Sequence, residues 1–242
     1  HSINSTMMIL CNLIIALCLG LQAAYAFSPA TPSATRSFTA STSSSSSSST
    51  ALSLTGFFGE YLPLGIPFVL AKDYWDKSRR SKLIEEILTL ASDTNRGLTA
   101  TDEQKQEMDN LFSQLEKLNP TVNPITNKNA KLNGDWSLDY TTSDSILGKA
   151  GFPRIGPIIQ NIDTTTLSAK NSEVVKYGIV NVPRSVSAEL SPVNGKLTDV
   201  KFKKFTFGPV GFNAPDSFRG SLDITYLDDE VRLTRGDKGN IF

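Results

Sequence analysis

The chain has 242 residues, with 24 basic and 24 acidic side chains and no block of either charge. This balance excludes the basic patch typical of nucleic-acid-binding proteins, and we expect no nucleic-acid partner. Both cysteines and the single histidine lie within the first 18 residues, so the rest of the chain has no thiol and no imidazole for catalysis or for zinc binding.

The first 55 residues have the composition of targeting segments. Residues 1–26 comprise six residues upstream of the first methionine, Met7, and an apolar run that ends in Ala-Tyr-Ala, which predicts a signal peptide. Residues 27–55 have no acidic side chain, one arginine and a long serine tract, as transit peptides do. Together they resemble the bipartite plastid presequence of algae whose plastids arose by secondary endosymbiosis. A transmembrane helix over 7–26 and a secreted protein with a mucin-like stalk are the alternatives.

An apolar lead-in and the start of a helix are assigned to residues 56–80. Residues 56–71 are too short to span a membrane and contain Pro63 and Pro67. They either cover the folded domain or lie in a membrane interface. Charged side chains become frequent only from Lys72 onward, so we expect the folded part to begin near that residue.

A helical hairpin is predicted at the start of the folded part and is assigned to residues 81–120. Apolar residues spaced by three and four predict that its first helix covers 73–90. Thr99 and Thr101 can cap a second helix, which ends before Pro120. The apolar stripe of this second helix consists of Met108, Leu111, Phe112, Leu115 and Leu118.

Beyond the hairpin, apolar and polar residues alternate, which predicts strands with one buried face over residues 130–242. The alternation is seen in LNGDWSLDYTT, SVSAEL and FRGSLDITY. In DVKFKKFTF an extra residue at 203–204 is needed to keep the apolar residues on one face, which predicts a β-bulge. Turn signals at Asn194-Gly195 and Asp228-Asp229 separate strands. We therefore predict a mainly antiparallel sheet that curls into a barrel, of a size that can hold a small apolar ligand.

Four stretches, taken in order, resemble the plastid lipid-associated protein family, also called fibrillins or plastoglobulins. They are LASDTNRGLTATDEQKQEMDNLFSQLEKLNP, LNGDWSLDYTTS, IIQNID and ITYLDDEVRLTRGDKGNIF, and together they cover residues 81–242. The resemblance implies a mainly β fold, a lipocalin-like antiparallel barrel preceded by the N-terminal helical hairpin. Family members usually continue with another apolar strand after the position of Phe242, which implies a barrel that is incomplete at its C-terminus.

The same resemblance implies a function. It implies a plastid (chloroplast) protein at plastoglobules or thylakoids that binds lipids, carotenoids or prenylquinones in a structural or carrier role. Its partners would be such an apolar molecule and the surface of a plastid membrane or plastoglobule. The alternative is a scaffold protein that assists a prenylquinone or carotenoid biosynthetic enzyme, and a photosynthetic membrane complex is a further partner to consider.

The inward face of the predicted barrel supplies the candidate ligand site. Its residues are Trp136, Leu138, Tyr140, Phe202, Phe205, Leu222, Ile224 and Tyr226. The competing interpretation is that these side chains only fill the barrel, as they do in many small barrels.

The resemblance also implies a set of structural residues near the first and last strands. They are Gly134, Trp136, Arg235 and Gly236. Strand parity places Arg235 with Val231 and Leu233, which we interpret as the inward face, and the resemblance then sets its guanidinium against the indole of Trp136. The tripeptide Arg-Gly-Asp that begins at Arg235 is interpreted as a strand end and turn, not as a cell-adhesion signal.

We predict a binding protein and not an enzyme, with no catalytic residue, cofactor or metal site. The sequence contains no Gly-rich phosphate loop, no metal-ligand spacing and no nucleophile elbow. Several acidic residues cluster near turns and are interpreted as solvated turn residues. These residues are Asp163, Asp223, Asp228, Asp229 and Glu230.

Overall fold

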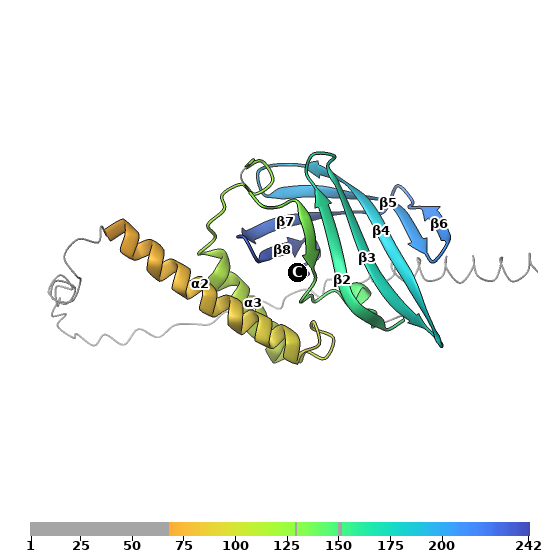
Figure 1. Cartoon of the computed structure of the whole chain (residues 1–242), viewed down its shortest axis with the longest axis horizontal. Helices are drawn as coiled ribbons and strands as arrows, with labels where there is room; N and C mark the ends of the chain where they lie inside the picture. The colour runs from red at the N-terminus through yellow and green to blue at the C-terminus, as the bar shows by residue number, and fades with distance from the viewer. Residues whose placement is uncertain (1–67, 129, 150–151) are drawn as a thin grey trace, which may run out of the picture.

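The computed structural model describes residues 68–128, 130–149 and 152–242 (Figure 1). The predicted signal peptide, the predicted transit segment and most of the apolar lead-in lie outside the described residues. Within the described ranges, no helix has the combination of length and apolar character that a membrane span needs.

The described chain begins with the predicted helical hairpin, formed by α2 (Phe68–Asp93) and α3 (Asp102–Glu116). Thr101 caps α3 as predicted. Its hydroxyl accepts a hydrogen bond from the backbone N–H of Gln104 over 3.2 Å, and the Gln104 side chain accepts one from the Thr101 N–H over 3.0 Å. This capping box satisfies two N–H groups that the first turn of a helix otherwise leaves unpaired. The buried side of α3 consists of Met108, Leu111, Phe112 and Leu115.

A glycine in the loop between the two helices allows the hairpin to approach the strands closely. Gly97 has a φ of +93°, and a Cβ atom there would lie 2.4 Å from the carbonyl oxygen of Thr141. The close approach lets the Thr141 N–H donate to the carbonyl of Arg96 over 3.1 Å. Because only glycine tolerates both the left-handed backbone and this contact, Gly97 fixes the hairpin beside the segment that follows the first strand.

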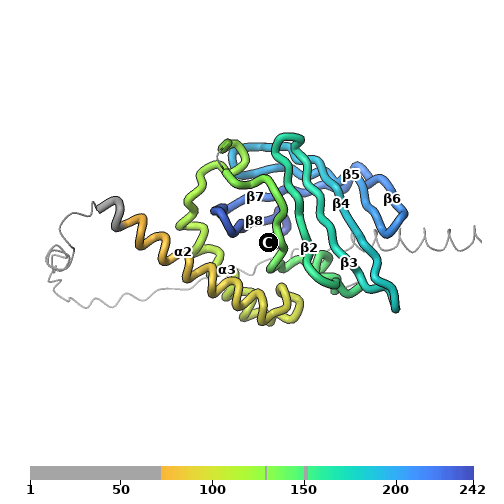
Figure 2. Tube along the Cα trace, in the orientation of Figure 1, coloured from red at the N-terminus to blue at the C-terminus, as the bar shows by residue number. Residues whose placement is uncertain are grey.

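The described strands form one antiparallel sheet of eight strands. They are β1 (Gly134–Ser137), β2 (Arg154–Asp163), β3 (Ser168–Tyr177), β4 (Val180–Pro192), β5 (Leu197–Phe207), β6 (Val210–Asn213), β7 (Arg219–Leu227) and β8 (Arg232–Gly236), with the short helix α4 (Asp144–Leu147) between β1 and β2. The order is β1-β2-β3-β4-β5-β7-β8, and β6 pairs with β5 outside this path. The sheet curls into an open half-barrel (Figure 2), and no ladder joins β1 to β8 among the described strands. The predicted fold, an incomplete lipocalin-like antiparallel barrel preceded by helices, is confirmed.

The helical hairpin packs against β7 and β8 on one side of the sheet (Figure 1). Asn119, just after α3, ties the hairpin to β7, because its side chain donates to the carbonyl of Thr225 over 3.0 Å and accepts from the N–H of Leu227 over 3.1 Å. The buried cluster between helices and strands consists of Leu83, Ile87, Ala91, Met108, Leu111, Phe112, Leu115, Tyr140, Tyr226, Leu233 and Ile241. On β7 and β8 we call this the helix-covered side, and the opposite side of these two strands belongs to the concave side of the sheet.

The predicted β-bulge in β5 is confirmed. Ala188 of β4 pairs with Phe202 of β5, whereas the preceding residue, Ser187, pairs with Lys204. Lys203 is therefore the extra residue, and it restores the following phenylalanines of β5 to the side that Phe202 occupies.

A second bulge, in β7, was not predicted and corrects the position of Tyr226. Ile224 pairs with Thr234 of β8, but Tyr226 pairs with Leu233, so Thr225 is an extra residue. The bulge turns Tyr226 to the helix-covered side, where its side chain is completely buried. The predicted inward position of Tyr226 is therefore wrong.

Candidate ligand cavity

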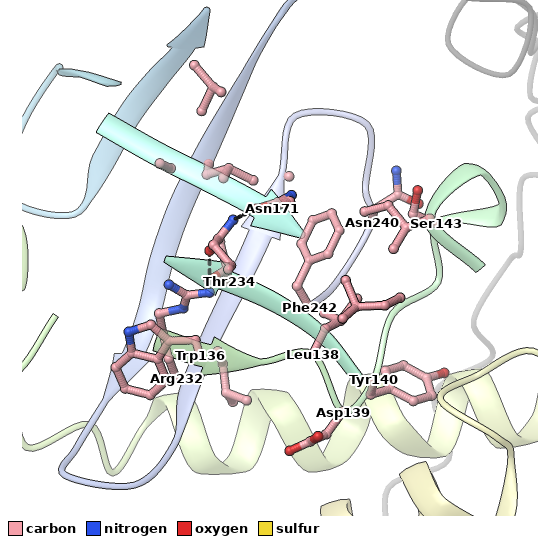
Figure 3. A pocket seen from close by; sticks show the side chains of 18 of the residues that line it. Trp136, Leu138, Asp139, Tyr140, Ser143, Asn171, Arg232, Thr234, Asn240 and Phe242 are labelled. Carbon is pink, nitrogen blue, oxygen red and sulfur yellow. Dashed lines mark hydrogen bonds between the residues drawn. The ribbon is translucent and has the colours of Figure 1, made fainter. Parts of the chain in front are cut away.

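The concave side of the half-barrel borders a cavity of about 220 Å³ (Figure 3). Every strand of the sheet except β6 contributes to its wall. The apolar part of the wall includes Leu138, Ile158, Val186, Ala188, Leu190, Val200, Phe202, Leu222 and Phe242. A smaller cavity of about 40 Å³ lies beside it and shares part of the same wall.

Helix α2 completes the wall of the larger cavity. Ile87, Leu88 and Ala91 line it together with residues of β1 and β8, the two strands that do not pair with each other. The hairpin therefore stands where a closed barrel would have another strand-to-strand contact, and an apolar molecule in the cavity would touch both helix and sheet.

The structure brings five of the predicted site residues to the larger cavity and separates the other three. Trp136, Leu138, Tyr140, Phe202 and Leu222 line the larger cavity. Ile224 lines the smaller one. Phe205 is buried beside the cavity, with its ring stacked on that of Phe202 at a centroid distance of 6.2 Å. Tyr226 lies in the helix–sheet cluster.

Polar side chains cross the inner wall of the cavity in a chain of hydrogen bonds (Figure 3). Nη2 of Arg232, on β8, donates to Oε1 of Gln160, on β2, over 2.6 Å. Nε2 of the same glutamine donates to Oδ1 of Asn171, on β3, over 2.9 Å. The guanidinium carbon of Arg232 also lies 5.1 Å from the ring centroid of Trp136. Burial lowers the pKa of Arg232 to about 10, so the group remains charged at neutral pH.

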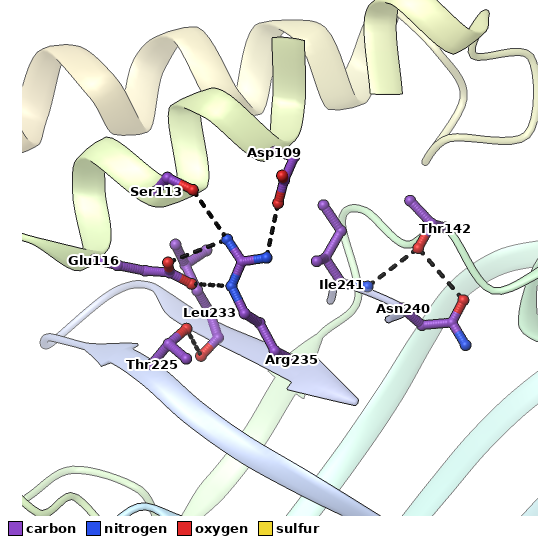
Figure 4. Close-up of polar contacts among 9 residues, drawn as sticks. All are labelled: Asp109, Ser113, Glu116, Thr142, Thr225, Leu233, Arg235, Asn240 and Ile241. Atoms are coloured by element: carbon purple, nitrogen blue, oxygen red, sulfur yellow. Dashed lines mark hydrogen bonds and ion pairs between the residues drawn. The ribbon is translucent and has the colours of Figure 1, made fainter. Parts of the chain in front are cut away.

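Arg235 does not contact Trp136, and the predicted stacking between them is wrong. Its guanidinium points to α3 (Figure 4). Nε donates to Glu116 over 2.6 Å, and Nη1 donates to Asp109 over 2.7 Å. The hydrogen bond with Glu116 is the main cause that raises the pKa of Arg235. Arg232, and not Arg235, lies over the indole of Trp136.

The alternation of residues along β8 was predicted correctly, but the wrong one of its two faces was assigned to the cavity. Leu233 and Arg235 do share a face, as predicted, but Leu233 packs in the helix–sheet cluster. Arg232 and Thr234 point the other way and line both cavities, whereas Leu233 borders only the larger one. Because both sides of β8 are covered, apolar character alone does not identify the side that faces the cavity.

Two glycines of the predicted structural set have different surroundings. A Cβ atom at Gly236 would lie 3.2 Å from the ring of Phe242, which lines the cavity, so a side chain there would displace that ring. Gly134 has a φ of +128° and nothing near its missing side chain. Gly236 also ends β8 before a turn, which is the strand end and turn that we predicted for the Arg-Gly-Asp sequence.

Sequence reasoning missed the polar members of the wall, Gln160, Asn171 and Arg232. Gln160 falls within IIQNID, a stretch singled out only for its resemblance to a family block. Asn171 lies in the polar strand β3, whose sequence has no apolar alternation. Only the register of β2 with β3, which pairs Gln160 with Asn171, shows that these two residues are neighbours.

The acidic residues near turns have structural partners. Oδ1 of Asp163 accepts from the backbone N–H of Thr165 over 2.8 Å, and Oδ1 of Asp228 accepts from that of Val231 over 2.7 Å. Asp223 pairs with Lys196 at 3.3 Å and Asp229 with Lys131 at 2.9 Å, whereas Glu230 lines the cavity. In the described part of the chain, no three or more His, Cys, Asp or Glu side chains gather into a group that could hold a metal ion.

Comparison with known proteins gives a consistent group of relatives. Residues 81–242 match the model of the PAP_fibrillin family. The chain is 36% identical over 167 residues to a probable plastid-lipid-associated protein 5, chloroplastic, of Arabidopsis thaliana, which covers 67% of this chain and 68% of the relative. It is 27% identical over 234 residues to a light-induced protein, chloroplastic, of Solanum tuberosum. This match covers 74% of this chain and 72% of the relative.

A third relative is named for a pigment. The chain is 27% identical over 218 residues to the chromoplast-specific carotenoid-associated protein C1, chromoplastic, of an Oncidium hybrid cultivar, covering 67% of each chain. None of these three names is that of an enzyme. No solved structure matches the chain.

Proposed function

The chain belongs to the PAP_fibrillin family, and on this premise we propose that it holds an apolar molecule in the cavity of its half-barrel. It is a plastid protein, as its chloroplastic and chromoplastic relatives are. The molecule is a lipid, a carotenoid or a prenylquinone, and the protein acts as a structural component or carrier at plastoglobules or thylakoids.

The apolar wall of the cavity is the observation that carries this proposal. Side chains such as Leu138, Val186 and Phe202 border the space on the sheet side, and Ile87 borders it on the helix side. A well-packed core would fill such a space, because an empty apolar cavity lowers stability in proportion to its volume. A ligand that occupied it would recover that loss through burial of its own apolar surface.

We further propose that the bound molecule leaves chemically unchanged. Three of the acidic groups near turns support this, because Asp163 and Asp228 accept backbone hydrogen bonds and Asp223 pairs with a lysine. Glu230 lines the cavity and is the first carboxylate to substitute in a test. A carboxylate engaged in this way is poorly placed to act as a general base on a ligand. Turnover of a bound carotenoid or prenylquinone that one carboxylate substitution abolishes would contradict this part of the proposal.

Fluorescence quenching tests the binding directly. Trp136 lines the cavity, whereas Trp75 lies exposed on α2 and would add an unrelated signal. In a Trp75→Phe background, a carotenoid or a prenylquinone added in detergent is expected to quench Trp136 with saturation at one ligand per chain. A signal that does not saturate would count against a defined site.

A cavity-filling variant with a matched surface control sharpens this test. Ala188 is buried in the wall, so Ala188→Phe places a ring in the ligand's space. Val193 is 55% exposed in the turn between β4 and β5, so Val193→Phe adds a ring far from that space. We expect Ala188→Phe to weaken binding by about tenfold or more, equivalent to about 1.4 kcal/mol, and Val193→Phe to leave it unchanged. Equal effects would contradict the cavity as the site.

Delivery to the plastid is assigned to the N-terminal segment. We propose that residues 1–26 contain the signal peptide, that 27–55 form the transit segment and that the fibrillin-type domain covers 81–242. A reporter fused to residues 7–55 is expected to enter the plastid. Retention of that reporter in the secretory pathway, or its export, would contradict the assignment.

A further inference from the structure

Arg232 is a charged group in the wall of a mainly apolar cavity. Asp139, Glu230 and Asp237 also line this cavity, but no carboxylate of the described residues forms an ion pair with Arg232. Within the described residues, its guanidinium forms no ion pair, and its one hydrogen bond goes to the neutral side chain of Gln160. Three other arginines that are at least partly buried have acidic partners. Arg154 and Arg184 both pair with Glu173, and Arg235 pairs with two carboxylates of α3.

The position of Arg232 makes the missing partner informative. Its side chain lines both the larger and the smaller cavity, and it shares this boundary with Gln160, Ala169, Leu190, Leu222 and Thr234. The guanidinium therefore lies at the inner end of the space, with apolar wall leading from it toward α2. A guanidinium has five N–H donors, so most of its hydrogen-bonding capacity is left for a ligand.

The positive charge of Arg232 favours an anionic ligand. Moving an ionised guanidinium out of water costs free energy. One hydrogen bond to a neutral amide and one contact with an indole recover only part of that cost. Burial lowers the pKa of Arg232 to about 10, which leaves the group protonated at neutral pH. A neutral carbonyl group of a ligand would add a hydrogen bond, but it would not balance the charge.

We propose that Arg232 binds the carboxylate of a long-chain acid, whose hydrocarbon chain lies along the apolar wall of the cavity. This inference rests on the proposed function, in which the cavity holds an apolar molecule. A carboxylate is planar and matches two parallel N–H groups of a guanidinium. It is also a small head group, so it occupies little of the roughly 220 Å³ and leaves the rest of the cavity to the hydrocarbon chain.

A matched acid and ester distinguish binding of the head from binding of the chain. The fluorescent lipid cis-parinaric acid and its methyl ester share one hydrocarbon chain and differ in head charge. Titration of each into the full-length protein at neutral pH is expected to show acid affinity higher by roughly tenfold or more, the range of a charge-assisted hydrogen bond. Arg232→Gln is expected to remove this preference and to leave ester binding unchanged.

Two further variants control the experiment. Arg79 is exposed on α2 and is not among the residues that line either cavity, so Arg79→Gln removes the same charge from the outer surface and is expected to leave the acid preference intact. Arg232→Lys keeps the charge without the planar fork and is expected to retain only part of the preference. Arg232→Lys tests the role of the guanidinium even if Arg232→Gln fails to fold.

The outcomes separate the two proposals. Equal binding of acid and ester by the wild-type protein would overturn the role of Arg232 and leave the lipid cavity standing. An unchanged preference in Arg232→Gln, or in Arg232→Lys if the first variant does not fold, would overturn it as well. Failure of both probes, together with failure of carotenoid and prenylquinone, would overturn the proposed function too.

Discussion

Arg232 and Arg235 lie three residues apart on β8 and face opposite sides of the sheet, where their surroundings differ in kind. Arg235 meets two carboxylates of α3 and the hydroxyl of Ser113. Arg232 meets one neutral amide and one indole. On the helix-covered side of β8 the charge is therefore balanced. The concave side keeps empty space and an unbalanced charge, which is the condition expected of a binding site and not of a structural core.

The largest expected difference between the two sides concerns packing. Leu115 is completely buried between α3 and the sheet, and Leu138 is half-buried in the cavity wall. Leu115→Ala is expected to lower the free energy of unfolding by about 2–5 kcal/mol. Leu138→Ala is expected to cost clearly less, because its side chain already borders empty space. Urea unfolding of both variants measures the difference, and equal losses would mean that the cavity is packed as tightly as the core.

Removing Arg235 is expected to have the next largest effect. Its side chain and that of Glu116 are partly buried, so Arg235→Met is expected to lower the free energy of unfolding by about 1–2 kcal/mol. In a double-mutant cycle with Glu116→Gln the two losses are expected to be non-additive, since the residues are in contact. A cycle of Arg235→Met with Trp136→Phe serves as the control and is expected to be additive. Coupling in the control would indicate that Arg235 contacts Trp136, contrary to the structure.

Removing Arg232 is expected to have little effect on stability, in contrast to Arg235. Replacing an unbalanced buried charge by an apolar side chain of similar length is often neutral or stabilising, here by up to about 1 kcal/mol. Thermal unfolding of ligand-free Arg232→Met at neutral pH measures this. A loss as large as that of Arg235→Met would show that the guanidinium is part of the structural core.

The smallest expected effect is a pH dependence of the stability difference between the wild-type protein and Arg232→Met. Burial lowers the pKa of Arg232 from its ordinary value to about 10 in the folded protein. Above about pH 10 the folded chain has lost this proton while the unfolded chain still holds it, so the unfolded state binds more protons and stability rises with pH. Relative to Arg232→Met, the wild-type protein is therefore expected to gain stability as the pH rises from about 9 through 10 to about 11. A constant difference across this range would contradict the lowered pKa.

The sequence predicts the elements whose pattern has one interpretation. The stripe of α3 has one wet and one buried face, and Thr101 marks its start. The bulge at Lys203 is visible because large aromatic residues stand on both sides of it, and a one-residue slip would turn half of them to solvent.

The sequence does not reveal elements whose two faces are both covered or both polar. The bulge at Thr225 leaves no trace in the pattern, because Ile224 and Tyr226 are apolar and each is buried on a different side. The strand β3 shows no alternation, because its inward residues include Asn171 and Glu173, which are paired with other polar side chains. The placement of Arg232 depends on where the helices pack, and a local pattern cannot report that.

Native mass spectrometry of the mature protein, purified from plastids with its own lipids, tests most directly whether the concave side is a lipid site. We expect one lipid, carotenoid or prenylquinone per chain in the wild-type protein and none in Ala188→Phe, whose added ring fills the cavity. A wild-type protein free of such a molecule, or the same bound molecule in both proteins, would contradict the cavity as the binding site.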